Sequence, residues 1–210
     1  MAGFLTKHRY TCATVFVDHN SNLSYVQFQN STSAKYTLEA NEAFELFSRQ
    51  RGLWVRNYHA DNSTFTTNNW VRTCYTKGQG PTFASVNAHH QNRKAEVCIR
   101  NLQEMARTSM IHANKRWPDA ITPNLWPYAT RMANESINAT PWIYNPNKAS
   151  PNSIFAKSDV QENPKLWYHF GCPVYILGSL DLAATWGVGL ASVRIGVAWT
   201  PSEACDRGAI

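Results

Sequence analysis

Three acidic residues have the types and spacing that could hold divalent metal ions: Asp18, Asp61 and Glu96. Asp18 and Asp61 each follow a predicted strand, and Glu96 lies near the start of a predicted long helix, opposite its apolar stripe. Because strand ends in one sheet project into a common crevice, the three carboxylates could converge. Three converging carboxylates repel each other unless a cation neutralises them, and hard oxygen ligands suit Mg²⁺ or Mn²⁺. Two such ions about 4 Å apart can activate a water or hydroxyl and stabilise the leaving oxygen of a phosphodiester.

Each of these acids also has a purely structural interpretation. Asp18 precedes His19 and Asn20 and could be a turn residue, and Asp61 could form an Asx turn with the Asn and Ser that follow it. Glu96 could pair with Arg100 one helical turn later. The spacing alone leaves both interpretations open for all three residues.

The elements that would position the acids are predicted from periodicity. Strands are expected over Tyr10–Val17, Leu23–Asn30, Leu53–Asp61 and Thr82–Val86, and the first two form an antiparallel pair. Helices are expected over Lys35–Arg51, Asn68–Thr76, Lys94–Trp117 and Asn124–Ile137. The order of strands and helices predicts a mixed α/β (α+β) domain.

Composition narrows the class of protein. The 210 residues carry a net charge of +6 with a pI of about 9.1, which suits a nucleic-acid partner but is also ordinary for solubility. The five cysteines are odd in number and widely spaced, which favours reduced thiols in an intracellular compartment over disulfides or a cysteine zinc site. Neither a signal peptide nor an apolar run long enough to span a membrane is evident.

Five segments, in order and at appropriate distances, resemble the integrase core of copia-type retrotransposons. They are FVDHNSNLSYV (Phe16–Val26), YHADNSTF (Tyr58–Phe65), HHQNRKAEVCIRNLQEMAR (His89–Arg107), MIHANKRWPDAITPNLWPYATRMAN (Met110–Asn134) and HFGCPVYIL (His169–Leu177). The resemblance covers roughly residues 8 to 177. It implies a ribonuclease-H-like fold, with a five-stranded mixed sheet flanked by helices.

The resemblance also implies a function. Asp18, Asp61 and Glu96 match the Asp-Asp-Glu triad of the family, which would bind two Mg²⁺ or Mn²⁺ ions. The implied reaction is DNA integration: nicking of retroelement DNA ends and their transfer into target DNA by a polynucleotidyl transferase. A nuclear location, a homo-oligomer and origin in a larger polyprotein follow from the family, and no membrane is involved.

Residues around Glu96 are candidates for DNA contacts. By resemblance, His89, His90, Gln91 and Asn92 form a loop before the third acid, where uncharged amides could contact bases or phosphates. The cations Arg93, Lys94, Arg100 and Arg107 lie near or along the Glu96 side of the long helix and could follow a phosphate backbone. A plain solvated loop and helix face are the alternatives. Zinc is rejected for the His pair because no second ligand pair stands at metal spacing.

Two departures from the family pattern bear on activity. Ser63 and Arg93 stand where the family usually has glycine, and both could stiffen or redirect the active-site loop. The upstream zinc module of complete integrases is not found, so we expect a fragment or degenerate copy. A second hypothesis is therefore a catalytically dead ribonuclease-H-like module that binds nucleic acid or self-associates. A cellular ribonuclease H is weaker, because such enzymes normally use four acids.

The expected organisation has three parts. Residues 8–140 form the integrase-like core, and residues 141–177 form a Pro/Asn-rich irregular extension. A Gly-rich tail of uncertain structure covers residues 178–210.

Overall fold

The computed structural model describes residues 9–61, 64–84, 92–141, 147–160, 167–175 and 195–197. The chain separates into two compact units. One comprises Met1–Ala106 with Pro123–Glu162, and the other comprises Arg107–Thr122 with Asn163–Ile210. No helix in the described part of the chain has the length and apolar character needed to cross a bilayer. The predicted boundaries at residues 140 and 177 stay a prediction.

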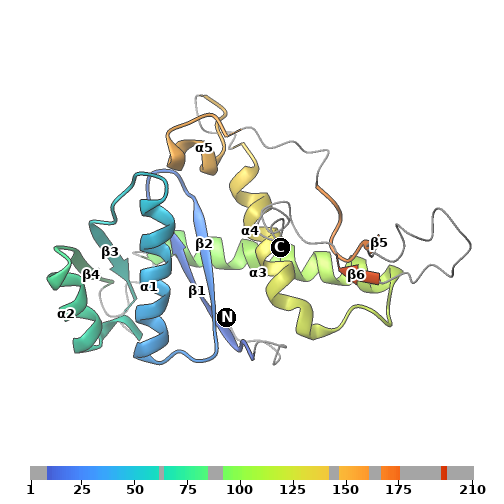
Figure 1. Cartoon of the computed structure of the whole chain (residues 1–210), viewed down its shortest axis with the longest axis horizontal. Coiled ribbons are helices and arrows are strands. Elements are labelled where there is room, and N and C mark those ends of the chain that lie inside the picture. The colour runs from blue at the N-terminus through green and yellow to red at the C-terminus, as the bar shows by residue number, and fades with distance from the viewer. Residues whose placement is uncertain are drawn as a thin grey trace, which may run out of the picture. The chain divides into compact units, whose positions relative to one another are not determined.

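The first unit begins with a hairpin of β1 (Cys12–Val17) and β2 (Ser24–Gln29) (Figure 1). The two strands are antiparallel, which confirms the pairing predicted from the sequence. The register runs from Cys12 opposite Gln29 to Val17 opposite Ser24. The helix predicted from Lys35 is confirmed as α1 (Ala34–Arg49). Phe44 of α1 stacks on Phe16 of β1, with 4.8 Å between ring centroids, so the apolar stripe of α1 covers the hairpin.

A second pair of strands follows along the chain. The strand β3 (Asn57–Ala60) pairs in parallel with β4 (Gly80–Phe83), and the crossover contains the short 3₁₀ turn η1 (Thr64–Thr66) and α2 (Asn68–Thr76). The helix α2 has the predicted bounds. Its Trp70 is fully buried against aromatic rings of β3, η1 and β4.

The expectation of a five-stranded mixed sheet is wrong for the described residues, whose strands form three separate two-stranded sheets. No backbone ladder joins β1 to β3. Side chains from both strands line a pocket instead, so the hydrogen bonds that would merge the first two sheets are not made.

The long predicted helix is confirmed as α3 (Arg93–Arg116), in which Leu102 is buried and Glu96 is exposed. After the 3₁₀ turn η3 (Pro123–Leu125), α4 (Trp126–Ala139) confirms the fourth predicted helix. Within the first unit, α4 packs against β2 (Figure 1).

The predicted irregular character of residues 141–177 is wrong in two places, where the structure has a short helix, α5 (Pro151–Ala156), and a short strand, β5 (Pro173–Tyr175). Ser150 caps this helix, because its Oγ accepts the backbone N–H of Ser153 at 3.2 Å, and Pro151 occupies the first turn. Phe155 of α5 stacks on Phe47 of α1.

The second unit contains the antiparallel pair β5 (Pro173–Tyr175) and β6 (Ile195–Val197). Of the expected Gly-rich tail, residues 195–197 are described.

One polar side chain anchors α4 to the outer edge of β2 and gives a first prediction. The Asn138 amide accepts the Ser24 N–H at 2.9 Å through Oδ1 and donates to the Ser24 carbonyl at 2.7 Å through Nδ2. Because Asn138→Ala leaves two buried backbone groups unpaired, we expect the free energy of unfolding to fall by about 1–3 kcal/mol. Urea denaturation measures this change. Asn101→Ala, at an exposed position of α3, is the control and should leave the midpoint unchanged; equal midpoints for both variants would contradict the anchor.

Candidate functional site

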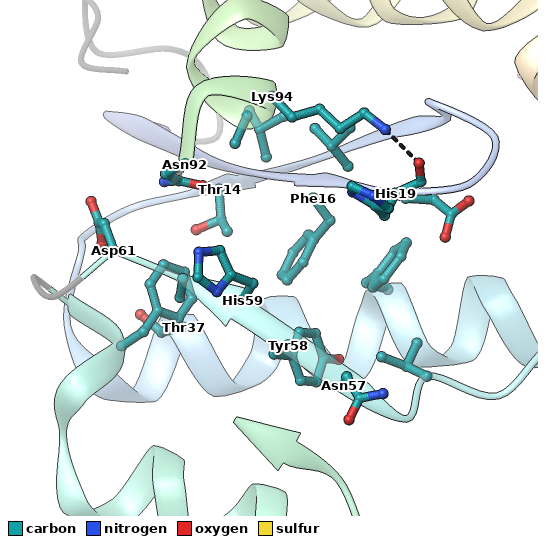
Figure 2. Close-up of a pocket in the computed structure, with 18 of the residues that line it drawn as sticks. Thr14, Phe16, His19, Thr37, Asn57, Tyr58, His59, Asp61, Asn92 and Lys94 are labelled. Carbon is teal, nitrogen blue, oxygen red and sulfur yellow. Dashed lines mark hydrogen bonds between the residues drawn. The ribbon is translucent and has the colours of Figure 1, made fainter. Parts of the chain in front are cut away.

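A pocket of about 890 Å³ lies between β1 and β3, beside the start of α3. Asp18, directly after β1, and Asp61, directly after β3, both line it. Asn92 and Lys94 contribute from the start of α3 (Figure 2). The expectation that the two aspartates follow strands is confirmed.

The carboxylate of Asp18 is engaged in the turn that joins β1 to β2. Its Oδ2 accepts hydrogen bonds from the backbone N–H and the hydroxyl of Ser21, both at 2.7 Å. The turn interpretation of Asp18 is thus confirmed. The same carboxylate still lines the pocket, so a turn role and a site role are compatible.

The structure does not bring the three acids together. Figure 2 shows Asp61 at one end of the pocket, near Asn92, and His19, the neighbour of Asp18, at the other end. Glu96 is exposed on α3 and is not among the residues that line the pocket. Within the described ranges, no three His, Cys, Asp or Glu side chains are grouped so that they could hold a metal ion. This arrangement does not fit a shared pair of ions, and the metal-binding role of the acids stays a prediction.

The missing β1–β3 ladder gives the physical reason. The expectation of convergence rests on neighbouring strands that end at the same edge of one sheet. Here the strands that carry Asp18 and Asp61 belong to separate sheets, so nothing in the backbone places their carboxyl ends together.

The predicted DNA-contact residues have different surroundings. Lys94 lines the pocket and its Nζ donates to the backbone carbonyl of His19 (Figure 2). Arg93 and Arg100 are exposed on the first half of α3, and Arg107 is exposed in the portion of α3 that belongs to the second unit. Glu96 makes no ion pair with Arg100, although both residues are described. His89, His90, Gln91 and the glycine-replacing Ser63 lie outside the described residues.

Sequence reasoning missed His59, which lines the pocket and is drawn below Thr14 in Figure 2. The hydroxyl of Thr82 donates to the Tyr58 carbonyl at 3.0 Å, so its oxygen is left to accept from the Nδ1–H of His59, also at 3.0 Å. This pairing leaves Nε2 of the neutral ring as an acceptor. The available signal was the two-residue spacing of His59 and Asp61, which places both side chains on one face of an extended segment.

A buried acid fixes the far side of β3. Glu45 of α1 accepts from the Tyr58 hydroxyl at 3.3 Å, from Gln79 Nε2 at 2.9 Å and from Lys77 Nζ at 3.0 Å. Burial, and then the negative charge of Glu45, raise the pKa of the Tyr58 phenol. The network joins α1, β3 and the turn before β4, so it holds the strand that leads to Asp61.

The same surroundings predict alkaline sensitivity. Burial, followed by the charge of Glu45, raises the pKa of the Cys74 thiol from 9.0 to about 11. The folded state therefore holds this proton more tightly than the unfolded state, and the resulting stability is complete below pH 9 and is lost as pH rises through about 11.

We expect urea midpoints to fall less steeply between pH 9 and 11 in Cys74→Ala than in the wild type. Cys172→Ala, which changes a thiol of the other unit, is the control and should keep the wild-type slope. Parallel curves for the wild type and Cys74→Ala would contradict the assignment.

No family model matches the sequence, and the comparison with curated proteins found no match. Solved structures do match. The integrase catalytic core domain of HTLV-2, solved in complex with magnesium in a trimeric form, is 16% identical, with a TM-score of 0.50 over 73% of this chain and 90% of that chain. A chain of the simian T-cell lymphotropic virus intasome, solved with the PP2A regulatory subunit B56 gamma, is 12% identical, with a TM-score of 0.55 over 93% of this chain and 64% of that chain.

The chain has the fold of a retroviral integrase catalytic core. This fits the ribonuclease-H-like architecture that the resemblance implies, although the described strands form smaller sheets. At these identities, the integrase-core likeness concerns the fold alone.

Proposed function

We propose that this chain is an integrase-type polynucleotidyl transferase that nicks the DNA ends of a copia-type retrotransposon and joins them to target DNA. The observation that carries the proposal is the pocket between β1 and β3 of an integrase-core fold, with an aspartate directly after each strand. In such a reaction the nucleophile is a water or a DNA 3′-hydroxyl, and the protein contributes positioning and charge.

The chain's own residues supply part of this environment. Lys94 places an ammonium group in the pocket, where it can contact a phosphate, and its hydrogen bond to His19 holds the start of α3 beside the end of β1. His59 Nε2 and the Asn92 side chain add polar groups near Asp61. These residues can bind and orient a phosphodiester.

The proposal includes a dependence on Mg²⁺ or Mn²⁺, with Asp18, Asp61 and Glu96 as ligands of two ions. The HTLV-2 core was solved with magnesium, which supports this part of the proposal. The described arrangement of the three acids does not fit a shared pair of metal ions. Activity requires the two ends of the pocket to approach each other.

DNA is the proposed partner, both as element ends and as target. The exposed cations Arg93 and Arg100, with Lys94, give the start of α3 a positive surface, and the exposed Arg107 of the second unit is a further proposed DNA contact. His89, His90 and Gln91 are also among the proposed DNA contacts. Association of several copies, a nuclear location and release from a polyprotein belong to the same proposal.

A second candidate is a nucleic-acid-binding module without catalysis. The observation that favours it is the separation of Asp61 from the Asp18 end of the pocket. Binding through phosphate contacts does not need the carboxylates to converge, so this function survives in the arrangement described.

One experiment separates the two candidates. The purified chain is incubated with an end-labelled duplex in Mn²⁺ or in EDTA, and binding and nicking are followed in parallel at increasing salt. Both candidates predict binding that weakens with salt, with a slope of log K against log salt of about −0.9 per phosphate contacted. Nicking in Mn²⁺ alone supports the transferase, whereas salt-dependent binding without nicking supports the second candidate. A flat salt response would contradict both.

A further inference from the structure

The segment between α1 and β3 presents an exposed tryptophan among arginines. Trp54 is 75% exposed, the largest fraction among the large apolar side chains that the structure describes as exposed. Arg49, Arg51 and Arg56 flank it and are also exposed, and no acid occurs between Leu46 and Ala60. We refer to Arg49, Arg51, Trp54 and Arg56 as the Trp54 platform.

The backbone of the platform is held on both sides of Trp54. The Leu53 N–H donates to the Ser48 carbonyl at 3.0 Å, and the Val55 carbonyl accepts from Gln79 Nε2 at 3.2 Å. Leu53 and Val55 are half-buried, so the alternation of an extended segment turns Trp54 and Arg56 to the outer face together. The tryptophan is therefore presented by an ordered backbone, which lowers the entropy cost of binding.

The arginines of the platform form no ion pair with an acid of the described chain, so their charges can interact with a ligand. The Arg51 guanidinium lies 3.6 Å from the Phe47 ring centroid and donates to the Phe47 carbonyl at 3.1 Å, which fixes its position. Neither Arg49 nor Arg56 forms an ion pair with any acid in the described part of the chain. Three arginines without an ion pair among the described residues, all within five positions of an exposed tryptophan, favour an anionic ligand that also carries aromatic rings.

We propose that the Trp54 platform binds single-stranded nucleic acid. An unpaired base stacks on the Trp54 indole, and the adjoining phosphates contact Arg56 and Arg49. A base in the interior of a duplex is stacked on both faces and offers neither to the indole, so the site favours unpaired strands. A second copy of this chain is a poorer occupant, because a symmetric dimer through this face would place the same arginines opposite one another.

The platform continues into the proposed active site. Trp54 and Arg56 line the same pocket as Asp18 and Asp61. A strand whose base stacks on Trp54 can therefore extend along the pocket that holds both aspartates. This inference shares the nucleic-acid ligand with the proposed function, but it needs no catalysis.

Fluorescence anisotropy of a labelled oligothymidylate, with a duplex of equal length alongside, tests the inference. Trp54→Ala should weaken single-strand binding roughly 5- to 150-fold, the range that loss of one stacked base produces, and should affect the duplex less. Trp54→Phe keeps an aromatic ring and should lose only a few-fold. Arg56→Gln should make the salt slope shallower by about 0.7, the value for one single-strand phosphate. Tyr168→Ala, at another exposed aromatic residue outside the pocket, is the control.

Single-strand binding that is unchanged in Trp54→Ala, or absent in the wild type, overturns the inference. It is also overturned if Trp54→Ala alters self-association in sedimentation while leaving the affinity of each protomer for DNA unchanged. Nicking of the duplex in Mn²⁺ is scored separately. Nicking without Trp54-dependent binding of single strands supports the proposed function and refutes the binding role of the platform. Trp54-dependent binding without nicking supports the binding role of the platform and refutes the transferase.

Discussion

Trp70→Ala is expected to lower the free energy of unfolding by about 3–5 kcal/mol, the range for removal of a large buried aromatic side chain. Trp70 is 0% exposed, and its ring centroid lies 5.7 Å from that of Tyr58, 5.4 Å from Phe65 and 5.9 Å from Phe83. Such a loss is a large fraction of the stability of a typical domain. The indole therefore holds β3, β4 and α2 together around one side chain.

Two further tryptophan variants sharpen this test in urea denaturation. Trp54→Ala removes the same side chain from an exposed position and should leave the midpoint nearly unchanged. Trp70→Phe should cost less than Trp70→Ala, because phenylalanine keeps most of the ring contacts and removes the indole N–H, which has no hydrogen-bond partner in the described structure. Equal effects of Trp70→Ala and Trp54→Ala would show that the core is assigned incorrectly.

Asp61→Asn is expected to reduce divalent-dependent nicking of duplex DNA at least about 100-fold, the usual scale for loss of one preorganised electrostatic group. Asp61 follows β3 directly and lines the pocket. A catalytic carboxylate acts through its charge, on a cation or on a proton, and an amide of the same shape lacks that charge. Initial rates with the labelled duplex in Mn²⁺ measure the effect.

The matched control is Asp119→Asn, which removes one negative charge from an exposed position outside the pocket. It changes the net charge by the same amount and should keep the wild-type rate. Because Asp61→Asn makes the chain more positive, its affinity for DNA should not fall. Full nicking activity in Asp61→Asn would assign the cleavage to a contaminating nuclease or to another site.

The helices of this chain could be predicted from sequence because their information is local. The apolar stripe of α3 recurs at steps of three and four, and α2 has the bounds that its flanking residues indicate. The strand ends at Asp18 and Asp61 could be predicted for the same reason. The Ser150-Pro151 cap of α5 was also a local signal, but the proline-rich surroundings favoured irregular chain.

The assembly of the strands and the surroundings of the acids could not be predicted in this way. Whether β1 pairs with β3 depends on packing between segments far apart in the chain, and the described strands leave a pocket between them. Glu45 lies between Phe44 and Leu46 on α1, and two of its hydrogen-bond donors, Lys77 and Gln79, are more than 30 positions away in the chain. The exposure of Trp54 is equally non-local, because composition alone would place a tryptophan in the core.

Joining of DNA tests the central claim most directly, because strand transfer distinguishes an integrase from a nuclease and from a binding module. The wild-type chain is incubated in Mn²⁺ with a duplex labelled at a recessed 3′ end and an unlabelled plasmid, and label covalently attached to the plasmid is measured. We predict a low yield of joined product that requires the divalent ion and disappears in Asp61→Asn but not in Asp119→Asn. A folded chain that binds both DNAs and yields no joined product with Mn²⁺ or Mg²⁺ would contradict the account.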